Sequence, residues 1–484
     1  MGEPINIPLE DDWAQNEGEM SSDAAIGDAD MTLRELLRAP LHPAELDISP
    51  GLVVDILLRM MFNEGEVSLR RFGEVTRLEL KLLDHLMLRL QEEHIVEVVS
   101  ASGVGRLGYS YSLSEEGTKR ARDALSRTQY IGPAPVPVEK YAQLIILQTQ
   151  QRLQISPQRV QQALAHLVLP DGFHRRIGPA LNANTSIFLY GPPGNGKTDI
   201  AQSIARLISG ADPLWVPFAL TVGGHIVSLY DPLIFREVPL SKEQLRAFKA
   251  DADSQVDRRF GYFRRPAVIV GGELTMAALD LRFDPVAKFY EAPLQLKANG
   301  GMFLIDDFGR QMISPTELLN RWVVPLESGV DYLRLQTGQT LAVPFRQLIV
   351  FSTNIEPRSL ADEAFLRRIQ MKVRVSGPDE RAFSQIFALY AQRLGVPLDK
   401  EGFLYMLQKW YRDCNRPMQA VHPRDILKII VAMAEYEGIP PRMTPDAIDA
   451  ACESYFVDSV ESNSNGNGNG PTQRPRGTPS TMRR

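Results

Sequence analysis

A glycine-rich loop carries the clearest chemical signal in the sequence. It is an unbroken run of eight residues: Gly191, Pro192, Pro193, Gly194, Asn195, Gly196, Lys197 and Thr198. Glycines let backbone N–H groups turn inward around phosphate oxygens, a lysine neutralises the β- and γ-phosphates, and a threonine hydroxyl binds Mg²⁺. The spacing therefore predicts a site for ATP with Mg²⁺.

The segments on either side of the loop have the order that this chemistry requires. The apolar run 186–190 indicates a buried strand, and residues 199–208 have the apolar spacing of a helix. The N-terminus of such a helix adds partial positive charge behind the phosphates. Glycine and proline also crowd ordinary turns, but here every fixed position of the motif lies between a strand and a helix. Asp199, at the start of the helix, is included in the predicted nucleotide site.

Two further apolar runs end in polar residues. The run 302–305 is followed by Asp306 and Asp307, and the run 348–351 leads to Asn354. In phosphoryl transfer, a carboxylate at the end of a strand holds Mg²⁺, and a neighbouring acid or amide can orient the attacking water. Asp306 is therefore the predicted metal-associated acid, and Asp307 and Asn354 are candidates for holding the water.

Arginines stand out at two later positions. Residues 362–369 indicate a short helix with the paired arginines Arg367 and Arg368. Arg424 opens a helix predicted over 425–437, with a proline in the first turn and a glycine after the last one. A surface salt bridge would explain either site alone, but the joint order of all the motifs favours a shared function.

That order resembles an AAA+ ATPase over about residues 140–457. The resemblance implies an α/β fold, a P-loop doubly wound parallel sheet with a C-terminal helical lid. It also implies a role for each motif. Gly194 to Thr198 match Walker A, Asp306 and Asp307 the Walker B pair, Asn354 sensor 1, Arg368 or its neighbour Arg367 the arginine finger, and Arg424 sensor 2 on the lid.

Asp307 departs from the family pattern, in which glutamate is usual. Aspartate is shorter by one C–C bond, about 1.5 Å, and misplacement on that scale can cost roughly 10²-fold in rate. Hydrolysis is therefore slow, or Asp307 reaches the water through a shifted backbone. Turnover is still expected, because Asn354 and an arginine finger remain.

A finger that reaches a neighbouring subunit's γ-phosphate implies a homo-oligomeric ring, most often a hexamer in this family. The long segment 221–300 between the two Walker motifs resembles the helix-2-insertion members, such as the MoxR-like group. It contains a charged helix predicted over 241–258. Hairpins of that group project toward the pore, so Leu274 and Met276 could grip a polypeptide, although an ordinary packing helix explains each of them equally well.

The N-terminal part has the pattern of a separate small domain. Residues 31–127 contain helical patterns at 51–62 and 77–94, then two alternating segments around a glycine-rich turn and a last helix. This order resembles an α+β winged-helix domain. Residues 74–97, which include the would-be recognition helix, hold six acids against three basic residues. That balance favours a protein-binding or packing role, because phosphate neutralisation supplies most non-specific DNA affinity. DNA binding is possible but disfavoured.

The remaining boundaries follow from composition. Residues 1–30 hold nine acids and no lysine or arginine, and residues 461–484 are rich in Asn, Gly and Arg; both tails are predicted to be disordered. Residues 128–139 are predicted to be a Pro-rich linker, 140–378 the nucleotide-binding subdomain and 379–460 the helical lid.

Few other function classes remain. The longest apolar runs fall far short of a membrane span, and two cysteines, Cys414 and Cys452, make neither a disulfide framework nor a zinc cluster. A cytoplasmic location fits best. The leading hypothesis is an ATPase ring that remodels or assembles an unidentified protein client. The alternatives are a DNA-associated ATPase that docks through the winged helix, and an ATP-held scaffold with little hydrolysis.

Overall fold

A computed structural model describes residues 33–101, 106–150, 153–183, 186–242, 255–360 and 363–456. Both predicted tails and most of the predicted charged helix lie outside these residues. The chain divides into two compact units, Met1–Pro378 and Asp379–Arg484. No helix in the described part of the chain is long and apolar enough to cross a membrane.

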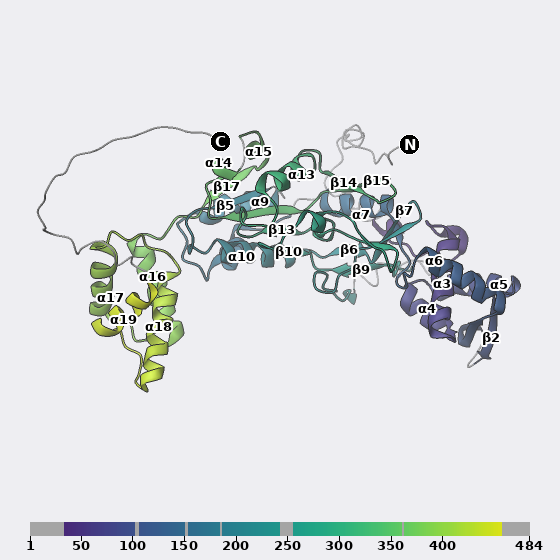
Figure 1. The fold of residues 1–484 in the computed structure, drawn as a ribbon, viewed down its shortest axis with the longest axis horizontal. Coiled ribbons are helices and arrows are strands. Elements are labelled where there is room, and N and C mark those ends of the chain that lie inside the picture. The colour runs from purple at the N-terminus through teal and green to yellow at the C-terminus, as the bar shows by residue number, and fades with distance from the viewer. Residues whose placement is uncertain are drawn as a thin grey trace, which may run out of the picture. The chain divides into compact units, whose positions relative to one another are not determined.

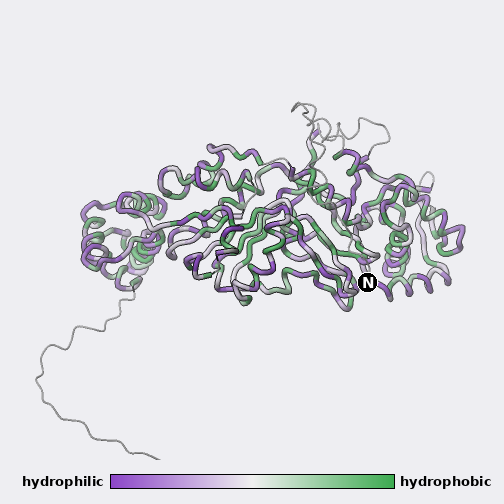
Figure 2. Tube along the Cα trace, turned by 90° about the horizontal axis from the view of Figure 1, so that it is seen from above, coloured by the Kyte–Doolittle hydropathy of each residue, from purple (hydrophilic) through white to green (hydrophobic). Residues whose placement is uncertain are grey.

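A five-stranded parallel sheet forms the centre of the first unit. Its strands are β5 (Ile187–Tyr190), β10 (Ala267–Val270), β13 (Met302–Ile305), β16 (Leu348–Thr353) and β17 (Met371–Arg374), in the order β10-β13-β16-β5-β17. The middle strands are almost continuously apolar because helices cover both faces. Figure 2 shows this hydrophobic centre along the strands.

Alternate residues of each strand enter two separate cores. Leu304 and Val350 pack with α8 (Pro157–Leu164), α9 (Phe173–Asn182) and α10 (Lys197–Ser209). Phe303 and Phe351 pack on the other face with α13 (Pro315–Ser328) and α15 (Glu363–Arg368). Figure 1 shows α10 and α13 on opposite sides of the sheet. The doubly wound parallel α/β fold class expected from the sequence is confirmed.

A second sheet and two ribbons extend the first unit. The sheet has the order β11-β12-β8-β7-β4. Its strands are β4 (Val136–Pro137), β7 (Ala219–Val222), β8 (His225–Ser228), β11 (Arg282–Asp284) and β12 (Phe289–Glu291). The ribbons pair β6 (Leu214–Pro217) with β9 (Phe260–Phe263), and β14 (Val330–Arg334) with β15 (Thr340–Pro344). Helix α7 (Val138–Gln150) packs into their shared core.

Of the two alternatives for Leu274, the structure favours an ordinary packing residue over a side chain that grips a polypeptide. Leu274 is only 1% exposed and packs in the core beneath α13, and Met276 packs against the same core. Met276 begins a single 3₁₀ turn, Met276–Leu279, instead of a projecting hairpin. The chain then continues into β11 and β12 of the second sheet before it reaches β13.

Among the described N-terminal residues, four α-helices of eight or more residues accompany a three-stranded antiparallel sheet. The helices are α3 (Pro50–Glu64), α4 (Leu69–Thr76), α5 (Leu80–Glu92) and α6 (Glu115–Arg127), and the strands are β1 (Val67–Ser68), β2 (Val96–Ala101) and β3 (Tyr109–Leu113), in the order β1-β3-β2. The helix expected from residue 77 begins at Leu80, because Arg77 caps α4 in a left-handed conformation. The apolar face of α5 is buried as expected.

The predicted linker 128–139 does not act as a spacer in this structure. Tyr130, Ala134 and Val136 are buried, and β4 pairs in parallel with β7. Ala219, from the second sheet, shares one core with α3 and α5. The Pro-rich composition therefore reflects an extended edge strand, where proline is tolerated.

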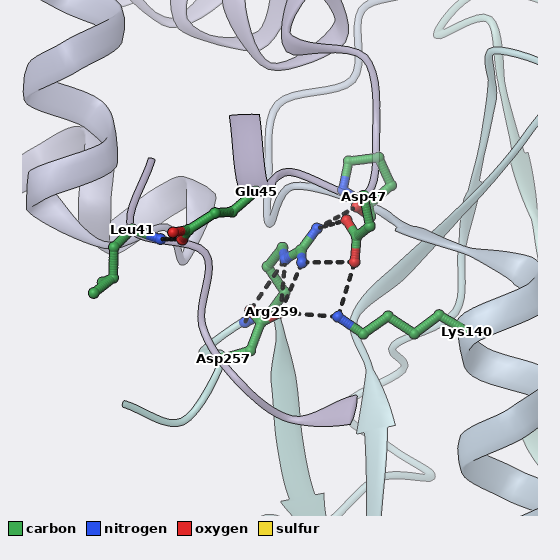
Figure 3. Close-up of polar contacts among 7 residues, drawn as sticks. Leu41, Glu45, Asp47, Lys140, Asp257 and Arg259 are labelled. Atoms are coloured by element: carbon green, nitrogen blue, oxygen red, sulfur yellow. Dashed lines mark hydrogen bonds and ion pairs between the residues drawn. The ribbon is translucent and has the colours of Figure 1, made fainter. Parts of the chain in front are cut away.

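A buried ion network joins the N-terminal residues to α7 and to the segment that leads into β9 (Figure 3). The Arg259 guanidinium, fully buried, donates to Asp257 at 2.7 Å and to Asp47 at 2.7 Å, and Lys140 reaches Asp47 at 2.8 Å. Burial alone would lower the pKa of Arg259, but the two carboxylates, Asp257 foremost, leave it raised. Asp47 precedes α3, whereas Lys140 lies on α7. The network thus fastens segments that are far apart in the sequence.

The second unit is a helical bundle. It contains α16 (Glu380–Leu394), α17 (Lys400–Met406), a π-helical turn at Leu407–Arg412, α18 (His422–Glu437) and α19 (Pro445–Tyr455). Gly438 ends α18 with a φ of 70°, as expected for a glycine after the last turn. All these helices contribute to one apolar core.

Replacing Arg259 with methionine should destabilise the first unit by about 3–5 kcal/mol, because the buried Asp257 carboxylate would lose its main partner and Lys140 alone would remain for Asp257 and the partly buried Asp47. The measurement is urea unfolding of the full chain followed by circular dichroism. Arg258→Met, at the exposed neighbour, is the matched control and should change the stability by about 0.5 kcal/mol or less. Equal stability of the two variants would contradict the network's role.

Candidate active site

The glycine loop connects β5 to α10 and depends on glycine for its shape. Gly194 and Gly196 have φ values of 73° and 78°, in the left-handed region that favours glycine. A Cβ at Gly191 would approach the carbonyl oxygen of Val375 to 2.2 Å. Because α10 begins at Lys197, the free N–H groups of its first turn adjoin the loop.

Lys197 is held inside the loop. Its Nζ donates to the carbonyl oxygens of Gly191 at 2.9 Å and Pro192 at 2.8 Å. Burial lowers the pKa of Lys197, while the charges of Asp307 and Asp306 oppose that shift. The predicted phosphate-binding lysine and the predicted acid pair therefore share one electrostatic environment.

The two acids follow β13 directly, and Asn354 follows the adjacent strand β16. The backbone N–H of Asp307 donates to Asp306 Oδ1 at 3.1 Å, and Asn354 Nδ2 donates to Asp307 Oδ1 at 3.2 Å. Parallel strands present their carboxyl ends at one edge of a sheet, which is where ligands of open α/β folds bind. The structure brings Lys197, Asp306, Asp307 and Asn354 together at this edge.

Thr198 and Asp199 lie exposed in the first turn of α10, beside Lys197. Pro192 and Pro193 are exposed at the tip of the loop. Asn195 is buried, and its Nδ2 donates to the carbonyl oxygen of Pro192 at 3.2 Å. The loop is thus held together from inside.

The donor set fits Mg²⁺. The Thr198 hydroxyl and the Asp306 carboxylate are hard oxygen donors, and Mg²⁺ is usually bound by one or two protein groups together with phosphates and waters. In the described part of the chain, no three His, Cys, Asp or Glu side chains gather into a dedicated metal cage. A metal that depends on the nucleotide for most of its ligands suits this arrangement.

The paired arginines of α15 have different surroundings. Arg368 Nε donates to Glu327 Oε1 on α13 at 2.6 Å, and the side chain is largely buried. Arg367 is exposed, and its side chain has no hydrogen bond or ion pair with the residues that the structure describes.

Arg424 belongs to the helical unit. It lies in the first turn of α18, and its Nε donates to Asp425 Oδ1 at 2.7 Å. Its neighbour His422 is buried against the Tyr411 hydroxyl at 3.0 Å, and burial lowers the pKa of His422 to about 4. A neutral imidazole therefore anchors the start of this helix.

Gln311 is a residue of the site that the sequence patterns missed. Its side chain bonds to the backbone of the turn that contains Asp306 and Asp307. It lies a few residues beyond the acids in an irregular segment, so neither helical nor strand periodicity could single it out.

Comparisons with known proteins give distant relatives. The helical unit matches a family described as a domain of unknown function, DUF8689, over residues 379–454. The chain is 26% identical over 234 residues to the vesicular-fusion protein sec18 of Schizosaccharomyces pombe, covering 48% of this chain and 23% of that protein. It is also 26% identical over 215 residues to a Rothia mucilaginosa protein named as an AAA ATPase forming ring-shaped complexes, covering 44% of this chain and 28% of that protein.

Solved structures include NtrX from Brucella abortus in complex with ADP, with a TM-score of 0.38 and 14% identity, covering 72% of this chain and 69% of NtrX. The chain matches only about a quarter of the length of the two curated relatives. The resemblance to AAA ATPases thus has support from sequence relatives. The finer resemblances, to MoxR-like members and to a winged helix, stay predictions.

Replacing Lys197 with alanine should weaken ATP binding by about 10- to 100-fold, because it removes a charge-assisted contact with the phosphates worth roughly 1.5–3 kcal/mol. Titration with a fluorescent ATP analogue measures this directly. Lys81→Ala, at an exposed lysine of α5, is the control and should bind like the unaltered protein. Unchanged affinity in Lys197→Ala would contradict the site.

Proposed function

We propose that this chain hydrolyses ATP as a subunit of a ring, a hexamer, and that hydrolysis drives remodelling or assembly of a protein client. The observation that supports it most is the convergence of Lys197, Asp307 and Asn354 at the ends of three neighbouring strands. A loop for phosphates, an acid and an amide at one sheet edge are the parts that hydrolysis of a nucleoside triphosphate needs.

Each residue has a task in this proposal. The loop N–H groups and Lys197 bind the phosphates, and Thr198 and Asp306 would hold Mg²⁺, which neutralises phosphate charge when bound. Asp307 accepts a proton from the attacking water or orients it, and Asn354 keeps the Asp307 carboxylate in place through their 3.2 Å hydrogen bond. Positioning and charge stabilisation supply most of the rate in such reactions.

The surroundings of the paired arginines favour Arg367 as the finger. Arg368 is engaged by Glu327 of its own chain, whereas Arg367 is exposed and extends from the same short helix. An arginine that acts on a neighbouring subunit must be accessible at the surface of its own subunit. A finger that acts on a neighbouring subunit is consistent with the proposed ring, and the Rothia relative is described as forming ring-shaped complexes.

The N-terminal domain, a winged helix in this proposal, acts in packing or as a protein adaptor. Three arginines on or near α5 have partners within the chain. Arg77 lies over the Phe218 ring at 4.7 Å, Arg89 pairs with Glu93 at 2.9 Å, and Arg106 pairs with Asp84 at 3.1 Å. Phosphate contacts would have to displace these partners, so DNA docking is disfavoured.

If Arg367 acts on the neighbouring subunit and Asp307 acts in its own, a variant that lacks one should complement a variant that lacks the other. Arg367→Ala and Asp307→Asn should each lower ATP turnover, by roughly 10³-fold for the finger, with ATP binding retained. Mixed subunits should regain activity, because some interfaces then combine an intact Asp307 with an intact Arg367. Phosphate release and native mass spectrometry of the mixture measure turnover and co-assembly. Co-assembly without recovered turnover would contradict a finger acting between subunits. Arg368→Ala is the control and should retain most of the turnover.

The proposal of a protein client predicts the result of a capture experiment. The Asp307→Asn variant, held with ATP, should retain the same discrete set of proteins from a native lysate before and after nuclease treatment. Quantitative mass spectrometry compares the two samples, with Lys197→Ala as the control that cannot enter the ATP state. Recovery of nucleic acid, or loss of the proteins on nuclease treatment, would favour the DNA-associated alternative.

A further inference from the structure

The backbone at Asp307 is unusual. Its φ is 50°, in the left-handed region, which residues with a Cβ adopt uncommonly, although aspartate tolerates it better than most. The turn begins as soon as β13 ends, so the Asp307 carboxylate leaves the strand in a direction that an extended backbone would not give. Because the aspartate side chain is short, the direction of its carboxylate depends on a fixed backbone conformation.

Gln311 holds this backbone with three hydrogen bonds. Its Nε2 donates to the carbonyl oxygens of Asp306 and Asp307, each at 3.1 Å. Its Oε1 accepts from the N–H of Gly309 at 2.7 Å. The Gln311 amide group therefore spans the turn from Asp306, which precedes the left-handed Asp307, to Gly309.

The other side of the turn is fixed by β16. The Thr353 hydroxyl donates to the carbonyl oxygen of Phe308 at 2.6 Å, and the Phe308 N–H donates to Ser352 at 2.7 Å. Asn354 follows directly on the same strand and bonds to the Asp307 carboxylate. The strand thus sets where Asn354 and Phe308 lie, and Gln311 sets the orientation of the peptide groups on either side of Asp307.

We propose that Gln311 is a positioning residue for Asp307, holding it in the left-handed conformation that lets the shorter carboxylate work in place of a glutamate. The inference rests on the proposed ATP hydrolysis. A short side chain has little freedom to compensate for a moving backbone, and misplacement of about 1 Å can cost roughly 10²-fold in rate. The three hydrogen bonds of Gln311 restrict that backbone movement.

The side-chain amide is chemically specific for this role. It supplies two N–H donors for two carbonyl oxygens and one acceptor for an N–H group. A glutamate at this position would keep the acceptor for Gly309 but would oppose two carbonyl oxygens with another oxygen. Methionine, of similar length, would supply neither donors nor a strong acceptor. Both substitutions therefore keep the approximate length of the side chain and remove the two donors, and only glutamate keeps the acceptor.

The test uses the full chain and compares Gln311→Met, Gln311→Glu and the control Gln162→Met, at an exposed glutamine of α8. Both Gln311 variants should lower kcat by about 10- to 100-fold, with the KM for ATP and the affinity for an ATP analogue changed by about twofold or less, since ground-state binding is not involved. The unfolding midpoint of each variant is measured alongside. Gln162→Met should match the unaltered chain.

A double-mutant cycle decides whether Gln311 acts through Asp307. In the Asp307→Asn background, Gln311→Met should cause no further loss of residual phosphate release. Full turnover in Gln311→Met, a parallel loss of ATP affinity, or losses that add in the double variant would overturn the positioning role and leave the proposed ATPase intact. If Asp307→Asn hydrolyses ATP as fast as the unaltered chain does, both the proposed function and the positioning role of Gln311 are overturned.

Discussion

The parallel pairing of β13 with β16, and of β16 with β5, is the constraint on which the candidate site depends. In this register Ile305 lies opposite Phe351, and Thr353 lies opposite Tyr190. The three strands therefore end at one edge, so the residues that follow them are neighbours, although 110 positions separate Lys197 from Asp307 and 47 separate Asp307 from Asn354 in the chain. Apolar residues on both faces hold this register, because a slip would expose core side chains.

The polar residues at that edge depend on one another more than on their own strands. Lys197 reaches back into the loop, Asn354 reaches across to Asp307, and Gln311 returns to the turn between them. A shorter acid at Asp307 would be a defect if the backbone were extended. The left-handed backbone at this residue changes where the carboxylate starts, and this supports the proposal that Asp307 reaches the water through a shifted backbone.

The first unit is also larger and more continuous than the order of its motifs suggests. The Pro-rich segment forms an edge strand, and the buried Arg259 network ties the N-terminal residues to α7. Breaking a buried ion pair costs far more than forming it contributes, so such a network disfavours independent movement of the segments it joins. In this unit the N-terminal helices share a core with the second sheet instead of hanging from a tether.

By itself, the sequence determined the local parts of this protein. The glycine loop, the apolar strands before Asp306 and Asn354, the apolar face of α5 and the glycine that ends α18 all follow from short-range spacing, because periodicity and φ preference act over a few residues. The doubly wound class followed from the order of those parts.

Only the tertiary structure decided which of these parts touch. Leu274, for which gripping a client and packing were both open, is buried. Two residues of the predicted linker form strand β4, and the paired arginines separated into one held by Glu327 and one exposed. Gln311 lies beside Asp306 because of a backbone turn that no residue pattern indicates. The physical reason is the same in each case: burial and hydrogen-bond partners come from segments distant in the chain, and local patterns contain no information about which distant segment will arrive.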